Sequence, residues 1–185
     1  RSDGTKAGTW MVKDIYPGGY GGAGDELIVY NDKIYFSGTD GTSSNDHNAE
    51  LWVSDGTEAG TRMVKDINTR DAGWPLGSSP DNFVVFKGTL YFTADTSRYG
   101  DDRELWKTDG TEAGTVLFKD IHPSGESVAN SFTVGGDHLF FVAVHPDYDR
   151  ELWVSDGTSD GTHLLKDIKS GGGSWPRELA FCNGK

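Results

Sequence analysis

Aromatic side chains stand among glycine, serine and proline in several short segments between the apolar runs of this chain. An aromatic ring in a surface loop can stack on the face of a sugar, and a neighbouring Asp or Asn can bond the sugar hydroxyls. The alternative is that these rings fill grooves inside the fold, because large rings are usually well buried. The residues that we expect to bind a ligand are Tyr16, Tyr20, Asp71, Trp74, His122 and Trp175.

Carboxylates gather in a second group of segments, at residues 40–48, 95–103 and 144–150. Two or three carboxylates in one loop, together with backbone carbonyls, offer the oxygen ligands that Ca²⁺ prefers. Their spacing does not match an EF-hand loop, and charged clusters commonly face water without binding a metal. A solvated acidic rim with no cofactor is therefore the alternative to a calcium site. The candidate calcium ligands are Asp40, Asp46, Asp95, Asp101, Asp102, Asp147 and Asp149.

A third set of carboxylates recurs at nearly constant spacing in the tripeptide Glu-Leu-Trp. Acid–base catalysis needs two carboxyl groups in different environments, and repeated copies do not provide them. We therefore assign no catalytic residue and predict structural ion pairs between neighbouring strands. The predicted pairs are Glu50 with Lys65, Glu104 with Lys119, and Glu151 with Lys166.

The sequence Asp-Gly-Thr occurs four times, with its Asp at positions 3, 55, 109 and 156. Such an Asp can accept hydrogen bonds from the backbone of its own turn, while the Gly takes a positive φ. A metal site is the alternative, but one Asp in a short turn cannot supply the about six to eight oxygens that calcium needs. We predict that each Asp caps its turn.

Motifs for nucleophilic, metalloprotease or phosphate-binding chemistry are absent from the sequence. The five histidines are scattered, and no two have the spacing of metal ligands on one strand. The single cysteine excludes an internal disulfide framework. We expect Cys182 to be a small buried hydrophobic side chain on a strand.

The elements that must position these residues belong to an internal repeat of about 50 residues. Its consensus is Glu-Leu-Trp-x-x-Asp-Gly-Thr-x-x-Gly-Thr-x-x-x-Lys-Asp-Ile. Each copy holds short runs of strand-forming residues separated by turn signals, and no segment has the apolar period of a helix. In the middle copy the four expected strands are residues 83–86, 90–93, 104–107 and 115–121.

A four-stranded unit of this length cannot bury both of its faces alone, so neighbouring units must pack on one another. Radial packing of four-stranded antiparallel units is a β-propeller. We therefore predict an all-β, β-propeller-like fold in which each repeat is one blade. Trp52, Trp106 and Trp153 are expected in the core between blades.

Antiparallel pairing also decides which connections share an end of the blade. The first and third connections within a blade are short hairpin turns, and they lie together at what we call the turn side. The second connection and the link to the next blade lie at the opposite end, which we call the loop side. The aromatic and acidic segments all belong to the loop side, where variable loops on a rigid scaffold commonly bind ligands.

We expect one repeat domain over residues 1–185, with full repeats at residues 25–78, 79–127 and 128–176. Residues 1–24 would hold the last strand of a partial blade, and residues 177–185 would hold the first strand of another. The ring of blades is then incomplete in this chain, and we expect the chain to be part of a longer protein.

The consensus resembles that of the ELWxxDGT repeat family of large secreted bacterial proteins, and the resemblance covers essentially all of residues 1–185. It implies a propeller-like protein in an extracellular or cell-surface location, and it implies no set of catalytic residues. The departures are small. Thr108 replaces Ser, and Ser159 and Asp160 stand where the other copies have Glu-Ala or Lys-Ala.

The chain carries 29 acidic and 17 basic residues, for a formal net charge of −12. Nucleic acids and anionic membranes attract basic surfaces, so we expect neither as a partner. No apolar run reaches the roughly 20 residues of a membrane helix, so we expect no insertion into a membrane.

The function that these features favour is that of a non-enzymatic binding or scaffold module, because variable aromatic and acidic loops contrast with uniform turns. The expected partner is a glycan or an extracellular protein, with self-association as a further option. One alternative is a fragment of a propeller-type carbohydrate-active enzyme. Another is a purely structural, calcium-stabilised repeat that assembles with itself.

Overall fold

The structure, a computed structural model, describes residues 1–18, 22–41, 48–70, 76–97 and 101–184. Within those ranges it contains twelve β-strands and no helix. The described residues therefore hold no helix of the length and apolarity that a membrane crossing requires. The prediction of an all-β fold is confirmed.

The strands form three four-stranded antiparallel sheets, here called blades 1, 2 and 3, and the strand order within each follows the sequence. Blade 1 consists of β1 (Ala23–Tyr30), β2 (Lys33–Gly38), β3 (Glu50–Ser54) and β4 (Arg62–Lys65). Blade 2 consists of β5 (Asp81–Phe86), β6 (Thr89–Asp95), β7 (Arg103–Thr108) and β8 (Val116–Lys119). Blade 3 consists of β9 (Asn130–Gly135), β10 (His138–His145), β11 (Asp149–Ser155) and β12 (His163–Lys166).

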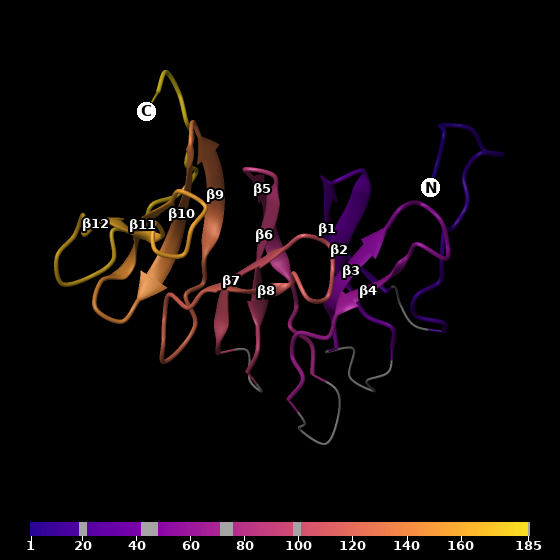
Figure 1. Cartoon of the computed structure of the whole chain (residues 1–185), viewed down its shortest axis with the longest axis horizontal. Coiled ribbons are helices and arrows are strands. Elements are labelled where there is room, and N and C mark those ends of the chain that lie inside the picture. The colour runs from indigo at the N-terminus through magenta and orange to yellow at the C-terminus, as the bar shows by residue number, and fades with distance from the viewer. Residues whose placement is uncertain (19–21, 42–47, 71–75, 98–100, 185) are drawn as a thin grey trace.

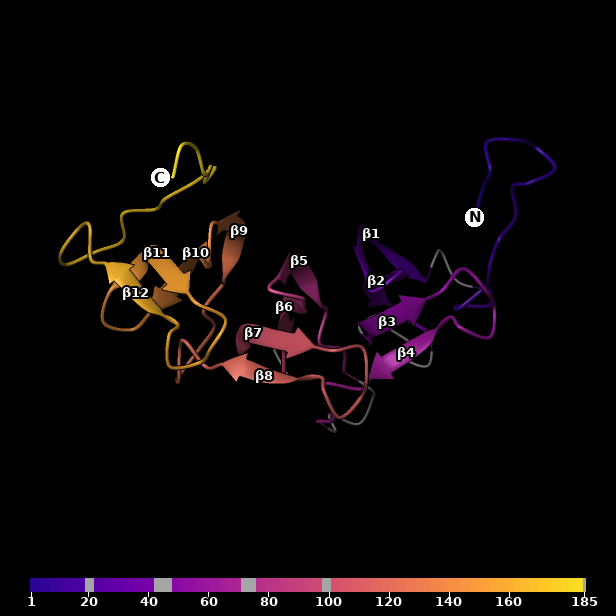
Figure 2. The same cartoon turned by 45° about the horizontal axis from the view of Figure 1, so that its top comes forward.

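The three blades lie side by side in an arc, with the two chain ends at opposite ends of it (Figures 1 and 2). The first strands approach one another, since β1 contacts β5 and β5 contacts β9. The fourth strands lie farther from this line of contact (Figure 2). This is the radial arrangement of propeller blades, and the propeller-like prediction is confirmed.

Two of the hairpin turns between first and second strands have a positive φ at both central residues. Asn31 and Asp32 have φ values of 49° and 59°, and Lys87 and Gly88 have values of 48° and 71°. Two consecutive residues with positive φ form the turn whose twist matches that of the flanking strands. These short turns fix the register of each blade.

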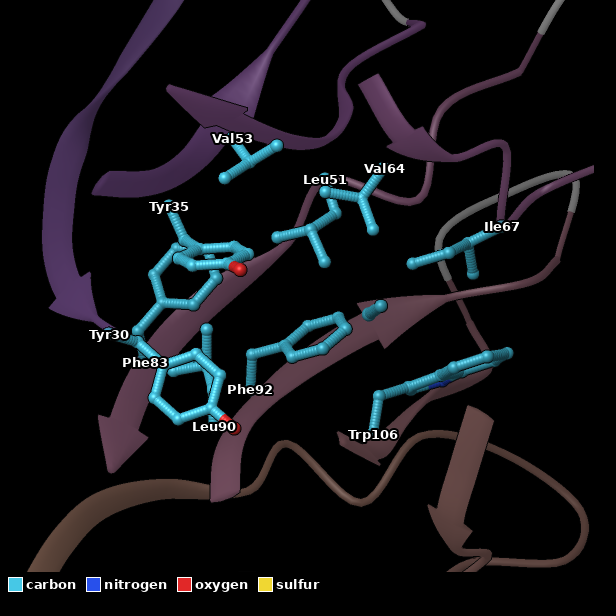
Figure 3. Packing of buried hydrophobic residues seen from close by; sticks show 11 residues of the cluster. Tyr30, Tyr35, Leu51, Val53, Val64, Ile67, Phe83, Leu90, Phe92 and Trp106 are labelled. Atoms are coloured by element: carbon cyan, nitrogen blue, oxygen red, sulfur yellow. The ribbon is translucent and has the colours of Figure 1, made fainter. Parts of the chain in front are cut away.

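The hydrophobic core lies between blades. Blade 1 contributes Tyr35, Leu51 and Ile67 to a cluster that blade 2 completes with Phe92 and Trp106. Figure 3 shows these side chains pointing toward one another from the two sheets. A second cluster of the same kind joins blade 2 to blade 3. In both clusters the Trp of Glu-Leu-Trp comes from the later blade and the Leu from the earlier blade.

The predicted burial of the tryptophans is confirmed, because Trp52, Trp106 and Trp153 are all buried. Burial of apolar faces by a neighbouring repeat is the main stabilising contribution in stacked repeats.

Lysine side chains connect each blade to the next on the turn side. Lys65 Nζ donates to the carbonyl of Thr115 at 2.8 Å, and Lys119 Nζ donates to the carbonyl of Ser159 at 3.1 Å. Lys13 Nζ makes the same kind of bond to the carbonyl of Thr61 at 2.7 Å. The Lys of Lys-Asp-Ile therefore bridges two blades.

The two sides of the fold are separated as antiparallel pairing predicts. On the turn side, the Tyr30 hydroxyl donates to the carbonyl of Gly88 in the next blade at 2.9 Å. On the loop side, Asp95 N donates to Ser78 O at 2.8 Å, and Val144 N donates to Ser127 O at 2.7 Å. Each of the two loop-side bonds joins the end of a second strand to the link that precedes its blade.

The segments before β1 and after β12 differ from expectation. Residues 1–18 and 168–184 contain no strand, although one strand was expected within residues 1–24 and another within residues 177–185. A strand needs a hydrogen-bonded neighbour, and neither segment forms a backbone ladder with a described strand. Residues 179–181 lie beside β9 only through side chains, as in the bond from the Thr133 hydroxyl to Leu179 O at 3.1 Å. The prediction for Cys182 is wrong for the same reason, since the thiol is exposed outside any sheet.

Candidate functional site

The Glu of Glu-Leu-Trp closes the link between one blade and the next. In blade 1, Glu50 Oε2 accepts a hydrogen bond from Ile67 N at 3.0 Å. Its Oε1 accepts bonds from Asn68 N at 3.2 Å and from Ser78 N at 3.0 Å. The Ser78 hydroxyl adds a fourth bond to Oε2 at 2.5 Å. One carboxylate thus holds both the first and the last residues of the link.

The same arrangement recurs in the other blades. Glu104 accepts bonds from Ile121 N at 2.8 Å, His122 N at 3.1 Å and Ser127 N at 3.0 Å. Glu151 accepts bonds from the amides of Ile168, Lys169 and Ser174 and from the Ser174 hydroxyl. These bonds satisfy backbone donors that would otherwise be buried without a partner.

The predicted Glu–Lys ion pairs are therefore wrong. The carboxylates bond backbone amides on the loop side, whereas Lys65 and Lys119 reach the next blade on the turn side. The described residues contain no Glu–Lys ion pair. The one close pair of a basic and an acidic side chain among them is His145 with Asp147, at 3.8 Å between Nδ1 and Oδ2. Sequence periodicity could not distinguish these partners, because a Glu–Lys ion pair and a Glu–amide hydrogen bond would each repeat once per blade.

Burial raises the pKa of Glu50 to about 7, although hydrogen bonds from Ser78, Ile67 and Asn68 act in the opposite direction. Burial also raises the pKa of Glu104 to about 7, against the bonds from Ile121, Ser127 and His122. A raised carboxyl pKa is a common mark of an active site, but it also arises in structural networks. Since every donor here belongs to the carboxylate's own link, the arrangement is structural.

The residue after the anchored Ser has a left-handed backbone in every blade. These residues are Ser79, Val128 and Trp175, with φ values of 44°, 47° and 56°. Such values are uncommon for any residue other than Gly and unusual for large or β-branched side chains. The fold therefore presents one side chain per blade at this point of the loop side. In blade 3 that side chain is a tryptophan.

The Trp175 ring lies partly in solvent, with 53% of the residue exposed. The guanidinium carbon of Arg150 is 5.0 Å from the ring centroid, which is a cation–π distance. Trp175 N donates to Arg150 O at 3.3 Å. A Cβ on Gly173 would lie 3.0 Å from Trp175 Nε1 and from Arg150 N, so the glycine permits this close approach.

The neighbouring loop of blade 3 adds polar groups and a second ring. Asp149 Oδ2 accepts a bond from Gly173 N at 3.1 Å, which ties this loop to the link that carries Trp175. The rings of His145 and Tyr148 are stacked with centroids 5.1 Å apart. Asp147 Oδ2 is 3.8 Å from His145 Nδ1. Half-exposed rings beside charged and hydrogen-bonding groups can stack on an apolar sugar face and bond its hydroxyls.

Of the predicted ligand-binding residues, the structure describes Tyr16, His122 and Trp175, and these three belong to different links between blades. Trp175 is exposed on the loop side, but His122 is held by its backbone bond to Glu104. Tyr16 packs against Gly41, where an added Cβ would lie 2.1 Å from the Tyr16 ring. Tyr20, Asp71 and Trp74 lie outside the described residues.

Sequence reasoning missed Arg150, His145 and Tyr148. Tyr148 has a signal in the sequence, since it is an aromatic residue between two Asp residues of a loop-side segment. Arg150 has none, because its contact with Trp175 joins residues from different connections.

No family model matches the chain, and no curated protein matches it. Among solved structures, the chain is similar to an alpha-L-arabinofuranosidase from Clostridium thermocellum ATCC 27405 at 14% sequence identity and a TM-score of 0.37. The matched region covers 75% of this chain and 48% of that chain. The chain therefore spans about half the length of that structure.

The candidate calcium ligands mostly have partners within their own loops. Asp40 Oδ1 accepts a bond from Asn48 Nδ2 at 2.8 Å, and Asp102 Oδ2 accepts one from the Thr96 hydroxyl at 2.5 Å. Asp101 N donates to the Ser97 hydroxyl at 2.8 Å. Asp46 lies outside the described residues. In the part of the chain that the structure describes, no three His, Cys, Asp or Glu side chains gather closely enough to hold a metal.

The Asp-Gly-Thr turns are capped as predicted. Asp55 Oδ1 accepts bonds from Thr57 N at 2.9 Å and from the Thr57 hydroxyl at 2.7 Å. These bonds lower the pKa of Asp55, with the hydroxyl bond as the largest cause. Gly56 has a φ of 85°. The other three copies make the same Asp–Thr bonds.

Proposed function

We propose that this chain is a non-enzymatic binding module that engages a glycan through its loop side, with Trp175 as the central contact. The observation that supports the proposal is a half-exposed indole at a position that the fold holds rigidly. Trp175 follows Ser174, which donates two bonds to the buried Glu151. A ring positioned in this way loses little conformational freedom when a ligand binds.

The surroundings of Trp175 match the chemistry of a sugar. One face of a pyranose or furanose ring is apolar and can stack on the indole, while Arg150, which contacts the indole, can bond hydroxyl groups. Asp147 and Tyr148 are further hydrogen-bonding groups in the loop that Asp149 ties to the Trp175 link. Arg150 already lies over the ring, which leaves the rest of the exposed indole as the contact surface. The resemblance to secreted repeat proteins supports an extracellular or cell-surface location, where such a ligand would be met.

Binding of Trp175→Ala to a panel of immobilised polysaccharides would test this proposal. We expect the variant to lose at least about fivefold in affinity for any glycan that the unmodified protein binds, because stacking on an aromatic ring contributes on the order of 1 kcal/mol or more.

Trp10→Ala is a matched control. Trp10 is also half exposed, at 50%, and Arg1 lies over its ring with the guanidinium carbon 5.2 Å from the centroid. Trp10, however, directly follows an Asp-Gly-Thr turn and so belongs to the turn side. Equal losses in both variants, or unchanged binding by a folded Trp175→Ala, would exclude the loop-side site.

A further inference from the structure

Two buried oxygen acceptors at the junction of blades 1 and 2 have no donor. Asn68 and Asp95 are each only 3% exposed. Asn68 Oδ1 and Asp95 Oδ2 receive no hydrogen bond from any residue that the structure describes. Leaving such groups buried without a partner is costly, and an unpaired buried charge is costlier still.

The orientation of both groups is fixed by their other atoms. Asn68 Nδ2 donates to Gly77 O at 3.1 Å and to Ser97 O at 2.9 Å. Turning the amide over would place its oxygen against these two carbonyls, so Oδ1 must remain where it is. Asp95 Oδ1 accepts a bond from Ser97 N at 2.6 Å, which leaves Oδ2 as the unbonded oxygen.

A closed circuit of hydrogen bonds holds the two groups together. Asn68 and Asp95 both bond Ser97, through its carbonyl and its amide respectively. On the other side, Asp95 N donates to Ser78 O at 2.8 Å. Ser78 N and Asn68 N both donate to Glu50 Oε1. The two unbonded oxygens therefore belong to one small buried network.

The charges in this network are not balanced. Glu50 and Asp95 are both buried, and no Lys, Arg or His forms an ion pair with either of them among the described residues. Glu50 is compensated by four donors, but the second oxygen of Asp95 is not. Buried carboxylates are usually paired with a cation or coordinate a metal.

The geometry points to a calcium ion bound at this junction, with Asp95 Oδ2 and Asn68 Oδ1 as ligands. Carboxylate, amide and carbonyl oxygens are the ligands that Ca²⁺ prefers, and water completes its coordination. A cation here satisfies the unbonded amide oxygen and neutralises the buried charge.

The site is specific to this junction, although the fold around it repeats. Asp95 is the strand partner of Arg103, which directly precedes the Glu of Glu-Leu-Trp in blade 2. In blade 3 the residue before that Glu is Arg150, and its strand partner is Val144, so Val144 is the counterpart of Asp95. The side chain of Val144 has no ligand atom. The equivalent of Asn68 is His122, whose amide also bonds the Glu of its blade. The second junction therefore lacks both oxygens, and the chain has one such site among its described residues.

Thermal unfolding of the full chain in increasing CaCl2, after treatment with a chelator, tests the proposal. At a free calcium concentration 100 times Kd, we expect Tm to rise by about 5–10 °C. MgCl2 at equal ionic strength is the control for general screening of the acidic surface. No rise, or an equal rise with MgCl2, would overturn the proposal and leave an ordered water as the occupant.

The variant Asp95→Asn locates the effect. It keeps the size of the side chain but removes the charge, so it should lose the rise in Tm while remaining at least as stable as the unmodified protein in chelator. Asp102→Asn in the same loop is the matched control and should keep the rise, because Asp102 Oδ2 already has the Thr96 hydroxyl as partner. A calcium response that persists in Asp95→Asn would place the ion elsewhere.

A second measurement needs no variant. The side-chain amide of Asn68 gives two resolved hydrogens in NMR, and calcium at Oδ1 would shift them during a titration of the unmodified protein. Amide signals of Asn68 that stay in place while Tm rises would also contradict the assignment.

Discussion

At the scale of single residues, the buried Glu of Glu-Leu-Trp determines the shape of the loop side. Its oxygens bond amides that are 17 to 28 residues away in the sequence, and the strand pattern gives no sign of these bonds. The exposed loop-side residue follows directly after the last of these amides. The conformation of Trp175 thus depends on a carboxylate that it does not touch.

Burial of the Glu carboxylate makes stability depend on pH. The pKa of Glu104 is about 7 in the folded protein, against 4.5 as its ordinary value. The folded state then binds this proton more tightly than the unfolded chain does, so this group's contribution is fully present below pH 4.5. It decreases as the pH rises through 7, by on the order of 3 kcal/mol across that window.

Comparison with Glu104→Gln isolates this effect, because Gln does not titrate. We expect the free energy of unfolding of the unmodified protein, minus that of Glu104→Gln, to decrease as the pH rises from about 4.5 to about 7.5. Urea unfolding at several pH values measures this difference. A difference that grows with pH would show that the three amide donors outweigh burial and that the carboxyl pKa is lowered.

At the scale of elements, the Asp-Gly-Thr turn depends on a second glycine. A Cβ on Gly60 would lie 2.0 Å from Asp55 Oδ1, so the carboxylate occupies the space of a side chain. We expect Gly60→Ala to lower the free energy of unfolding by about 1–3 kcal/mol, because the capping Asp must move away from its turn. Urea unfolding measures the change.

A double-mutant cycle with Asp55→Ala identifies the cause. If the clash with the carboxylate is responsible, Gly60→Ala should cost clearly less in the Asp55→Ala background. An equal cost in both backgrounds would attribute the loss to the backbone of Gly60 itself.

Elements of this kind were largely predictable from the sequence, whereas their contacts were not. In blade 2 the four predicted strands match β5 to β8 closely, and the turn at Lys87 and Gly88 is where residue types place it. The carboxylate of Glu50 and the amine of Lys65 recur in phase, so periodicity could not show that they bond opposite sides of the fold. The contact between Arg150 and Trp175 joins two different connections and depends on packing alone.

At the scale of the whole molecule, the blades are held together by apolar faces that repeat in sequence but differ in burial. Ile67 and Ile121 are 6% and 2% exposed, because each packs against the following blade. Ile168 stands at the same place in the repeat and is 53% exposed. These three isoleucines occupy the same position of the repeat, so they differ mainly in how far the side chain is buried.

Truncation of the same residue type in two blades turns this comparison into a measurement. In the chain of residues 1–185, we expect Ile121→Ala to lower the free energy of unfolding by about 2–5 kcal/mol, because it leaves a cavity between blades 2 and 3. Ile168→Ala removes the same atoms from a half-exposed site and should change it by at most about 0.5 kcal/mol. Urea unfolding of both variants gives the two values. A large loss of stability in Ile168→Ala would contradict the exposure of this side chain. If that loss depended on protein concentration, a second molecule would cover Ile168, because only an intermolecular contact weakens on dilution.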